Sequence, residues 1–262
     1  MPQVQQLYWR ILIFNNLGNH MIESVNNQQI KNAIKLKQKK YRHLTNQFLI
    51  EGEHLVGEAL DASRVFKIYV RHGFTCPFNF EYIEEVSDKV MDALCDTQSH
   101  SNIVALCGLN NDALVVGNSC ICYQVQDPGN LGTIIRSAYA FGFSQCVLVD
   151  CVDVYNDKTV RSSQGALFHI GIIQAKDIYD VIHSCHEMGI STVATSLHQA
   201  EPLRETQFKL PVAIALGNEG QGLPTEVVNA CGQSVKIEMS AFESLNVAVA
   251  GSILMYTIQN LK

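Results

Sequence analysis

The sequence has few of the features that mark disordered, disulfide-rich or zinc-binding chains. It contains only six prolines, and 47% of its 262 residues are hydrophobic, which excludes a largely disordered chain. Its nine cysteines are scattered, odd in number, and without a C-x-x-C pair. This pattern argues against a secreted disulfide scaffold and lacks the second ligand pair of a zinc site. We therefore expect reduced, buried thiols in a cytoplasmic protein without a bound metal.

A long apolar segment is also missing. The run 7–14 contains the only tryptophan, but it is too short to cross a bilayer and Arg10 interrupts it. No small-residue cleavage site follows, so a signal peptide is not predicted, and no membrane partner is expected. Residues 1–20 either pack on the body as an extra element or form a tail outside the native product. We expect the working protein to begin near Met21.

An excess of basic residues is absent from the chain as a whole, but not from one segment. The 19 basic and 25 acidic residues give a net charge of −6, which argues against a strongly basic nucleic-acid binder. Residues 24–50, however, hold six basic residues and no acidic one, so the rest of the chain has 13 basic against 25 acidic, or −12. A helix is predicted over 28–42. Its basic side chains are either a solvated face or a surface for a polyanion.

Strands and helices alternate along the chain, which predicts two α/β domains. The polar, turn-rich stretch 108–117 places the boundary between a domain over 21–108 and another over 113–262. The strands of the second domain are continuously apolar, which indicates a mostly parallel sheet covered on both faces. The elements expected are strands 48–50, 65–70, 103–107, 119–125, 145–150, 169–174, 190–195, 211–216 and 235–238, and helices 28–42, 53–60, 178–188 and 245–259, with a further helix after Pro128-Gly129.

Three polar, glycine-rich stretches lie where strands end, which is where parallel sheets bind ligands. The first, 126–137, enters a helix that Asn130 can cap, with Arg136 less than two turns further on. Either this is ordinary capping with a surface arginine, or the helix N-terminus and the guanidinium bind a phosphate. The second, 216–224, holds three glycines around Glu219. The third, 243–251, opens the last helix, which Ser244 or Asn246 could cap.

Several familiar catalytic patterns do not match. The second stretch is neither a Walker loop nor a G-x-G-x-x-G motif, which disfavours a nucleoside triphosphatase or an NAD enzyme. A fourth polar stretch, 160–166, contains Ser163, but not in a G-x-S-x-G elbow. His183 and His186 have helical spacing without a completing ligand set, and we interpret them as solvated helix histidines.

Taken together, the three stretches resemble the signature motifs of the SpoU/TrmH family of RNA ribose 2′-O-methyltransferases. The matching patterns are N-x-G-x-x-x-R (130–136), G-x-E-x-x-G (217–222) and S-L-N-V (244–247), in the family's order and spacing. Residues 160–168 are similar to the family's segment between the first two motifs. Residues 48–52, leading into a helix, are similar to the small substrate-binding domain that often precedes the methyltransferase. The resemblance covers residues 30–262.

The resemblance implies a C-terminal α/β domain with a deep trefoil knot, a homodimer, and S-adenosylmethionine as cofactor. The cofactor contacts it implies are Thr195, Leu216, Gly217, Ile237, Met239 and Leu245. Its implied catalytic residue is Arg136, with Asn130, Glu219, Ser244 and Asn246 holding that arginine and the substrate in place. A guanidinium has a pKa above about 12, so we expect Arg136 chiefly to bind the RNA phosphate and orient the 2′-oxygen.

With RNA as the implied substrate, we interpret the basic segment as a phosphate-binding surface formed by Lys31, Lys35, Lys39 and Arg42. The two-domain layout favours ribosomal RNA over transfer RNA. Two alternatives stay open: a transfer RNA 2′-O-methyltransferase, and a non-catalytic RNA-binding or ribosome-assembly protein of the same fold. The sequence does not identify the RNA, the nucleotide or its position.

Overall fold

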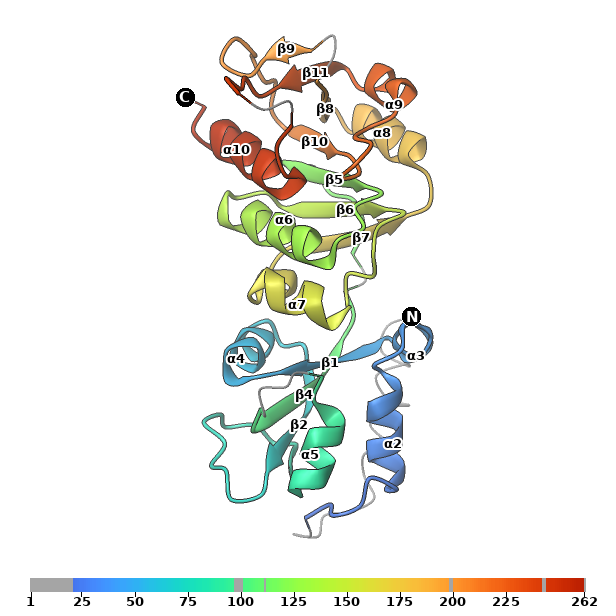
Figure 1. Cartoon of the computed structure of the whole chain (residues 1–262), viewed down its shortest axis with the longest axis vertical. Coiled ribbons are helices and arrows are strands. Elements are labelled where there is room, and N and C mark those ends of the chain that lie inside the picture. The colour runs from blue at the N-terminus through green and yellow to red at the C-terminus, as the bar shows by residue number, and fades with distance from the viewer. Residues whose placement is uncertain (1–20, 97–100, 111, 198–199, 242–243, 262) are drawn as a thin grey trace.

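The structure is a computed structural model that describes residues 21–96, 101–110, 112–197, 200–241 and 244–261. The predicted tail, 1–20, lies outside the described residues. Two β-sheets lie one after the other along the long axis of the molecule (Figure 1). No helix among the described residues is long and apolar enough to cross a membrane.

The smaller sheet is built by the N-terminal part of the chain. Its outer strand β3 runs parallel to β2, and the other neighbours are antiparallel. Helix α4 (Glu53–Asp61) packs on one face of the sheet, and α2 (Gln28–Lys35) and α5 (Asp88–Leu94) pack on the other. In spatial order the strands are β1 (Gln47–Glu51), β4 (Ile103–Gly108), β2 (Val65–Arg71) and β3 (Ile83–Val86).

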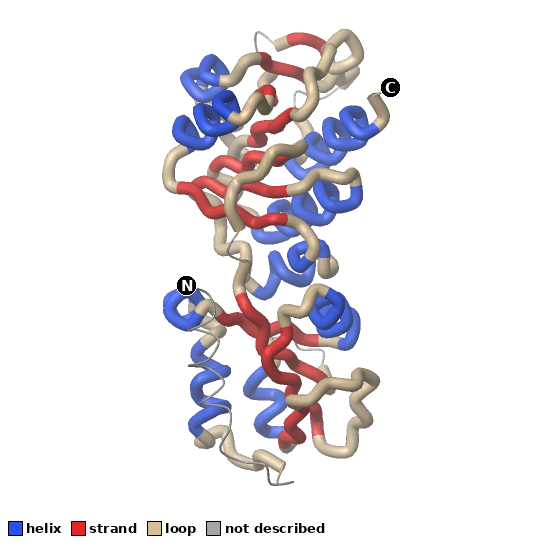
Figure 2. Tube along the Cα trace, turned by 180° about the vertical axis from the view of Figure 1, so that it is seen from behind, coloured by secondary structure: helices blue, strands red, loops and turns tan. Residues whose placement is uncertain are grey.

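The larger sheet has seven strands, and every neighbouring pair is parallel. Strand residues alternate between its two faces, and both sets are apolar because helices cover both faces (Figure 2). The mostly parallel α/β sheet is therefore confirmed. In spatial order the strands are β7 (Gly171–Ala175), β6 (Gln145–Val149), β5 (Ser119–Tyr123), β10 (Val212–Leu216), β8 (Ser191–Thr195), β11 (Gln233–Lys236) and β9 (Glu201–Pro202).

The helices of this part divide between the two faces of the larger sheet. Figure 1 shows α6 and α10 on one side and α8 and α9 on the other. The strand ends differ by only a few residues from the prediction, whereas the structure adds α5, α7, α9, β3 and β9. The trefoil knot stays a prediction. The helices are α6 (Pro128–Ala140), α7 (Asp157–Ser163), α8 (Ile178–Glu187), α9 (Thr225–Ala230) and α10 (Val247–Gln259), and Ala166–Phe168 forms a short 3-10 helix.

The single helix predicted over 28–42 is wrong, because the chain breaks into α2 and α3 (Lys39–Thr45). Leu36 turns into the core at the break, and the Arg42 guanidinium donates to the carbonyl oxygens of Leu36 and Lys37, 2.8 Å from each. Arg42 also forms an ion pair with Asp153, and the two side chains are only 8% and 9% exposed. The expectation that Arg42 contacts RNA is therefore wrong: its charge is used inside the protein.

Arg42 and Asp153 belong to a continuous contact between the two sheets. The Phe48 ring of β1 lies 4.8 Å from the Tyr155 ring and 6.1 Å from the Phe168 ring, centroid to centroid. Nearby, His169 Nε2 lies 2.7 Å from a carboxylate oxygen of Glu58 on α4. Since the apolar residues here form one core cluster spanning both sheets, the N-terminal part is held against α7 and the 3-10 helix.

Candidate active site

The three motif stretches meet at the carboxyl ends of the strands of the larger sheet. Strands β5 and β10 are parallel neighbours, so the turns that follow them lie side by side. The turn after β5 leads into α6, the turn after β10 contains Glu219, and the N-terminus of α10 lies beside α6 (Figure 1). The sheet therefore places residues almost a hundred positions apart in the sequence within hydrogen-bond distance.

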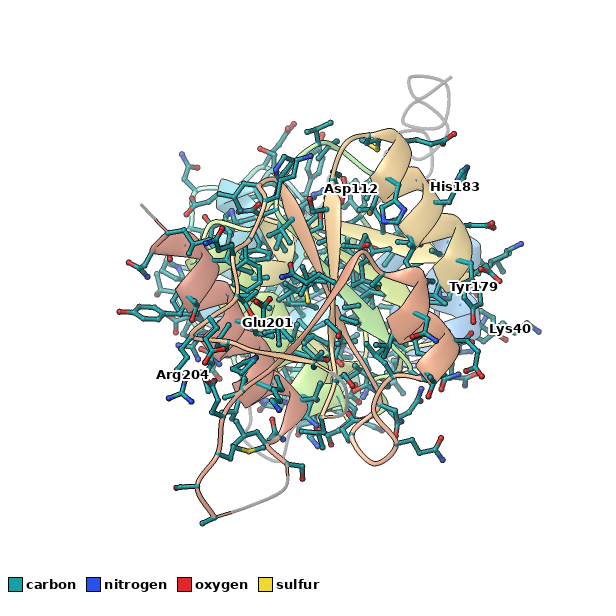
Figure 3. All side chains as sticks on the ribbon, turned by 90° about the horizontal axis from the view of Figure 1, so that it is seen from above. Lys40, Asp112, Tyr179, His183, Glu201 and Arg204 are labelled. Atoms are coloured by element: carbon teal, nitrogen blue, oxygen red, sulfur yellow. The ribbon has the colours of Figure 1, made fainter. Side chains whose placement is uncertain are left out.

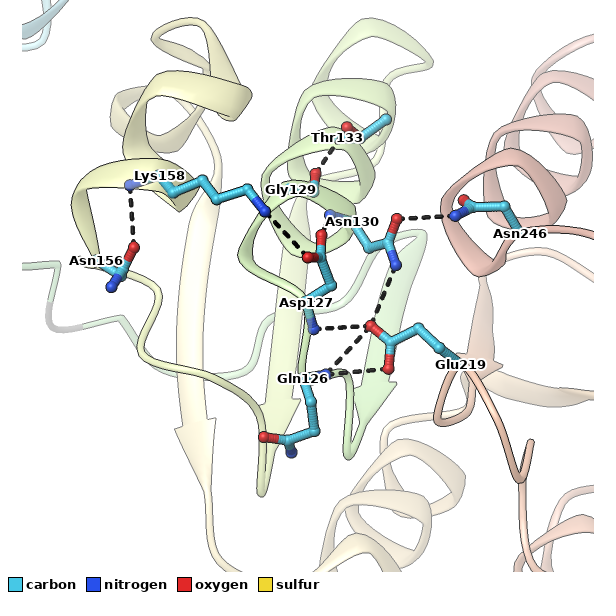
Figure 4. Close-up of polar contacts among 9 residues, drawn as sticks. All are labelled: Gln126, Asp127, Gly129, Asn130, Thr133, Asn156, Lys158, Glu219 and Asn246. Carbon is cyan, nitrogen blue, oxygen red and sulfur yellow. Dashed lines mark hydrogen bonds and ion pairs between the residues drawn. The ribbon is translucent and has the colours of Figure 1, made fainter. Parts of the chain in front are cut away.

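An amide–carboxylate network joins these three segments, and we define it as Gln126, Asp127, Asn130, Glu219 and Asn246 (Figure 4). Glu219 Oε1 accepts from the Asp127 backbone N–H at 2.9 Å and from Asn130 Nδ2 at 3.2 Å. Both carboxylate oxygens also accept from the Gln126 backbone N–H, at 3.1 and 3.2 Å. On the other side, Asn246 Nδ2 donates to Asn130 Oδ1 at 2.9 Å. Three of the predicted catalytic residues are thus directly bonded to one another.

The N-caps of α6 and α10 determine which side chains remain available to the network. Asp127, not Asn130, is the N-cap of α6, with Oδ1 accepting from the Asn130 backbone N–H at 2.9 Å. The prediction that Asn130 caps α6 is wrong, and its side chain is left to bond Glu219 and Asn246. The signal was present in the sequence, because proline is favoured at the first helical position and here it is Pro128. The predicted cap of α10 is confirmed for Asn246, which accepts from the backbone of Ala248 and Val249.

Hydrogen bonds keep the Glu219 carboxylate ionised. Partial burial raises its pKa, but the backbone N–H groups of Asp127 and Gln126 and the Asn130 amide together lower it by more, so the net pKa lies below the usual value. The pKa of Asp127 is also lowered, first by the Asn130 backbone N–H and then by Lys158. Two negative charges therefore lie within the network at neutral pH.

Two glycines allow the close approaches on which this site depends. A side chain on Gly217 would overlap the backbone of Gly222, with which the neighbouring Asn218 exchanges two hydrogen bonds of 2.9 and 3.2 Å. On α10, a Cβ at Gly251 would lie 2.6 Å from Leu216 Cδ1 at the end of β10. Gly217 therefore lets the second stretch close its own turn, and Gly251 lets α10 lie close to the end of β10.

Arg136 lies apart from the network. It is exposed on α6, and its guanidinium forms no hydrogen bond or ion pair with any described residue. The expectation that Asn130, Glu219, Ser244 and Asn246 hold this arginine is therefore not met within one chain. Ser244 is exposed at the other side of the site, where it lines a cavity.

A cavity of about 280 Å³ opens next to the network. It lies between the ends of β8, β10 and β11 and the start of α10, and Glu219 lines it as well. Leu216, Ile237 and Leu245 supply apolar wall, and the glycine-rich turn supplies backbone polar groups, a combination that fits a nucleoside-containing cofactor. All six residues predicted to contact the cofactor line this cavity: Thr195, Leu216, Gly217, Ile237, Met239 and Leu245.

The histidines and acidic residues that the structure describes do not form a metal centre. Among the described residues, no group of three or more histidine, cysteine or acidic side chains is placed to hold a metal ion. Figure 3 shows His183 on the outer face of α8, and its ring pairs with Glu187 at 3.4 Å. His186 bonds Thr192 Oγ1 at 2.7 Å. Both contacts are local to α8 and the strand beside it.

We expect Glu219→Gln to loosen the site. The glutamine oxygen can replace Oε1, but its NH2 group would place a donor against the Gln126 N–H in place of Oε2. This should cost about 1 kcal/mol at this solvent-exposed position and reduce methyl transfer about tenfold or more. Because the folded-state pKa is lowered, the stabilisation by Glu219 is present above its unfolded pKa and is lost as pH falls through the folded pKa. Urea unfolding of both chains should therefore differ at pH 7 and converge in acid. Equal midpoints at pH 7 would contradict this role.

Comparison with known proteins identifies the class that this geometry belongs to. The SpoU rRNA Methylase family matches residues 117–256, more than half of the chain, and an MRM3-like substrate binding domain matches residues 27–105. The chain belongs to the SpoU family, and it is a methyltransferase that uses S-adenosylmethionine.

Individual relatives cover almost the whole chain. The 23S rRNA (guanosine(2553)-2′-O)-methyltransferase RlmP of Bacillus subtilis is 36% identical over 245 residues, covering 91% of this chain and 98% of the relative. An rRNA methyltransferase from Sinorhizobium meliloti has the same fold, with a TM-score of 0.83, 29% identity, and coverage of 94% of this chain and 100% of that one. An AdoMet-bound rRNA methyltransferase from the same organism gives a TM-score of 0.81 and 29% identity, and the match covers 93% of this chain and 99% of that one.

Proposed function

We propose that this chain transfers the methyl group of S-adenosylmethionine to a ribose 2′-hydroxyl of ribosomal RNA, with 23S rRNA as the substrate. The observation that carries this proposal is the position of Glu219, which lines the cavity and holds Asn130 at the same time. A cofactor site and an array of polar side chains for a substrate thus share one wall. The relative named RlmP, similar over nearly its full length, supports 23S rRNA.

The chain's own residues would act mainly by positioning. Bound S-adenosylmethionine supplies an electrophilic methyl group, and its transfer to oxygen is an in-line displacement that depends strongly on alignment. Arg136 would bind the RNA phosphate next to the target ribose and orient the 2′-oxygen. Asn130, Ser244 and Asn246 would hold the nucleotide. Because a guanidinium is a poor base, removal of the hydroxyl proton would be assisted or relayed.

The two parts of the chain would divide the work, with residues 21–108 binding RNA and residues 113–262 carrying out the transfer. Lys31, Lys35 and Lys39 support this division, since all three are exposed and none of residues 24–50 is acidic. Neutralising these three lysines together should weaken RNA binding and lower the slope of log K against log salt by about two. Replacing Lys89, Lys176 and Lys209 changes the net charge equally and serves as the control. An unchanged slope would contradict RNA contact at α2 and α3.

The exposed face of α6 and α10 supports a homodimer. These helices lie side by side, joined by Ser137 and Ser252, whose hydroxyl oxygens are 2.7 Å apart. They nevertheless leave Tyr139, Val249 and Tyr256 about half exposed. A second copy would cover this apolar surface and bring polar groups to Arg136, which has none bonded to it in the part of the chain that the structure describes. We place this enzyme in the cytoplasm, where it would meet ribosomal RNA.

Mapping ribose methylation in total RNA, from cells with and without this gene, tests the proposal. We expect one 2′-O-methyl group to disappear from 23S rRNA. Loss of a methyl group from transfer RNA instead would overturn the choice of substrate. A calorimetric titration with S-adenosylmethionine should show saturable binding, and its absence would favour the non-catalytic alternative.

A further inference from the structure

Lys158 is bonded to the amide–carboxylate network but belongs to none of the three motifs. It lies on α7, and its Nζ is 3.1 Å from Asp127 Oδ2 (Figure 4). Among the described residues, it is the only cation that forms an ion pair with a member of the network. The pair is open to solvent, with side-chain exposures of 56% for Lys158 and 45% for Asp127.

The packing of α7 on α6 fixes the position of Lys158. A Cβ at Gly132, the glycine of the first motif, would lie 2.5 Å from the Thr159 carbonyl oxygen and 2.9 Å from the Ser163 nitrogen. The α7 backbone therefore contacts α6 directly where Gly132 has no side chain. Asn156 then caps α7 by accepting from the Lys158 backbone N–H at 2.9 Å.

The Lys158 side chain passes over Gly129 at the start of α6. A Cβ at Gly129 would lie 3.5 Å from Lys158 Cε and 2.8 Å from Asp127 Oδ1. The 3.5 Å distance is an ordinary contact distance, so the extended Lys158 side chain packs against the first turn of α6. The ammonium group thus extends across the first turn of α6 to the Asp127 carboxylate. Asp127 in turn donates its backbone N–H to Glu219, so Asp127 contacts both charged side chains.

The negative charges of the network favour a cation next to Asp127. Asp127 and Glu219 are both ionised, and an approaching RNA strand adds further negative charge. Exposed ion pairs contribute little to stability, so exchanging Asp127 for another anion would cost little. We propose that Lys158 is an RNA-phosphate ligand, which pairs with Asp127 in the free chain and moves onto a backbone phosphate near the target ribose when RNA binds. This inference rests on the proposed RNA substrate.

Two substitutions in the full-length chain separate this role from a structural ion pair. The assay is binding of an unmodified 23S rRNA transcript over a range of KCl concentrations. Lys158→Ala should weaken binding about three- to tenfold near 0.1 M salt and lower the salt slope by about one. Lys158→Arg keeps the charge and should bind nearly like the parent chain. Asp127→Asn keeps a good N-cap but removes the competing anion, so it should bind equally or up to about fivefold more tightly.

The matched control is Lys209→Ala. Lys209 is exposed and precedes β10, so it lies at the end of that strand opposite to the network. This substitution should leave affinity and slope unchanged, and S-adenosylmethionine affinity should be the same in all variants. If Lys158→Ala and Asp127→Asn weaken RNA binding equally, with the slope unchanged, Lys158 is only a structural partner of Asp127 and the inference is overturned. Methyl transfer by the parent chain is scored separately, so a transcript that is bound but not methylated would count against the proposed function alone.

Discussion

Arg136→Ala should abolish methyl transfer to RNA while leaving S-adenosylmethionine binding nearly unchanged. Arg136 is exposed on α6 and does not line the cavity, so its removal leaves the cofactor site intact. Loss of one preorganised charged group at a reacting centre typically costs about a hundredfold or more in rate. Single-turnover methylation of the rRNA substrate, with calorimetry of the cofactor, measures both effects.

Arg136→Lys provides the matched control. It keeps the positive charge but not the planar fork that binds a phosphate through two parallel hydrogen bonds. We expect intermediate rates, between those of the parent chain and the alanine variant. Near-normal turnover by Arg136→Ala would remove Arg136 from the mechanism.

Arg42→Ala should produce the largest loss of stability. Its partner Asp153 would keep a buried charge without a counter-ion, and the carbonyl groups of Leu36 and Lys37 would lose their donor. Removing one partner of a buried ion pair typically costs about 3–5 kcal/mol. Urea unfolding measures this cost, and Lys39→Ala, at an exposed position on the same helix, should change stability by less than about 0.5 kcal/mol.

A double variant keeps this prediction testable if the single variant does not fold. Arg42→Met together with Asp153→Asn removes both charges, so no carboxylate is left unpaired, and much of the lost stability should return. The introduced asparagine amide could still accept, through its oxygen, the hydrogen bond that the Tyr155 backbone N–H now donates to Asp153. If the single variant were as stable as the parent chain, Arg42 would not anchor the contact between the sheets.

The burial of Arg42 could not be predicted from the sequence. Its place in a basic helical run predicted an exposed side chain, and no local feature indicates Asp153, which is 111 residues away. The helix breaks near Leu36 for the same reason: tertiary partners at the break outweigh local helix propensity. Buried strands such as β5, β6 and β10 were predictable because a covered parallel sheet requires continuous apolar runs.

The residues of the site could be predicted from the sequence, but the hydrogen bonds between them could not. The motifs identified Asn130, Glu219 and Asn246, and the order of the strands, which no local pattern encodes, brings them into contact. Lys158 carried no signal of its own in the sequence. Its proximity to Asp127 follows from the close packing at Gly132, which only the three-dimensional arrangement reveals.

The nine free cysteines supply a reporter for the coupling between the two sheets. Seven are buried, and burial raises the pKa of Cys95 to about 12 and those of Cys185 and Cys231 to about 11. Alkylating reagents attack the thiolate, so these groups react at neutral pH only when the surrounding structure opens. The labelling rates of Cys95 and Cys107 then report how often the smaller sheet opens. Those of Cys185 and Cys231 report how often the larger sheet opens. Equal labelling rates would mean that the two sheets open together, as a single cooperative unit.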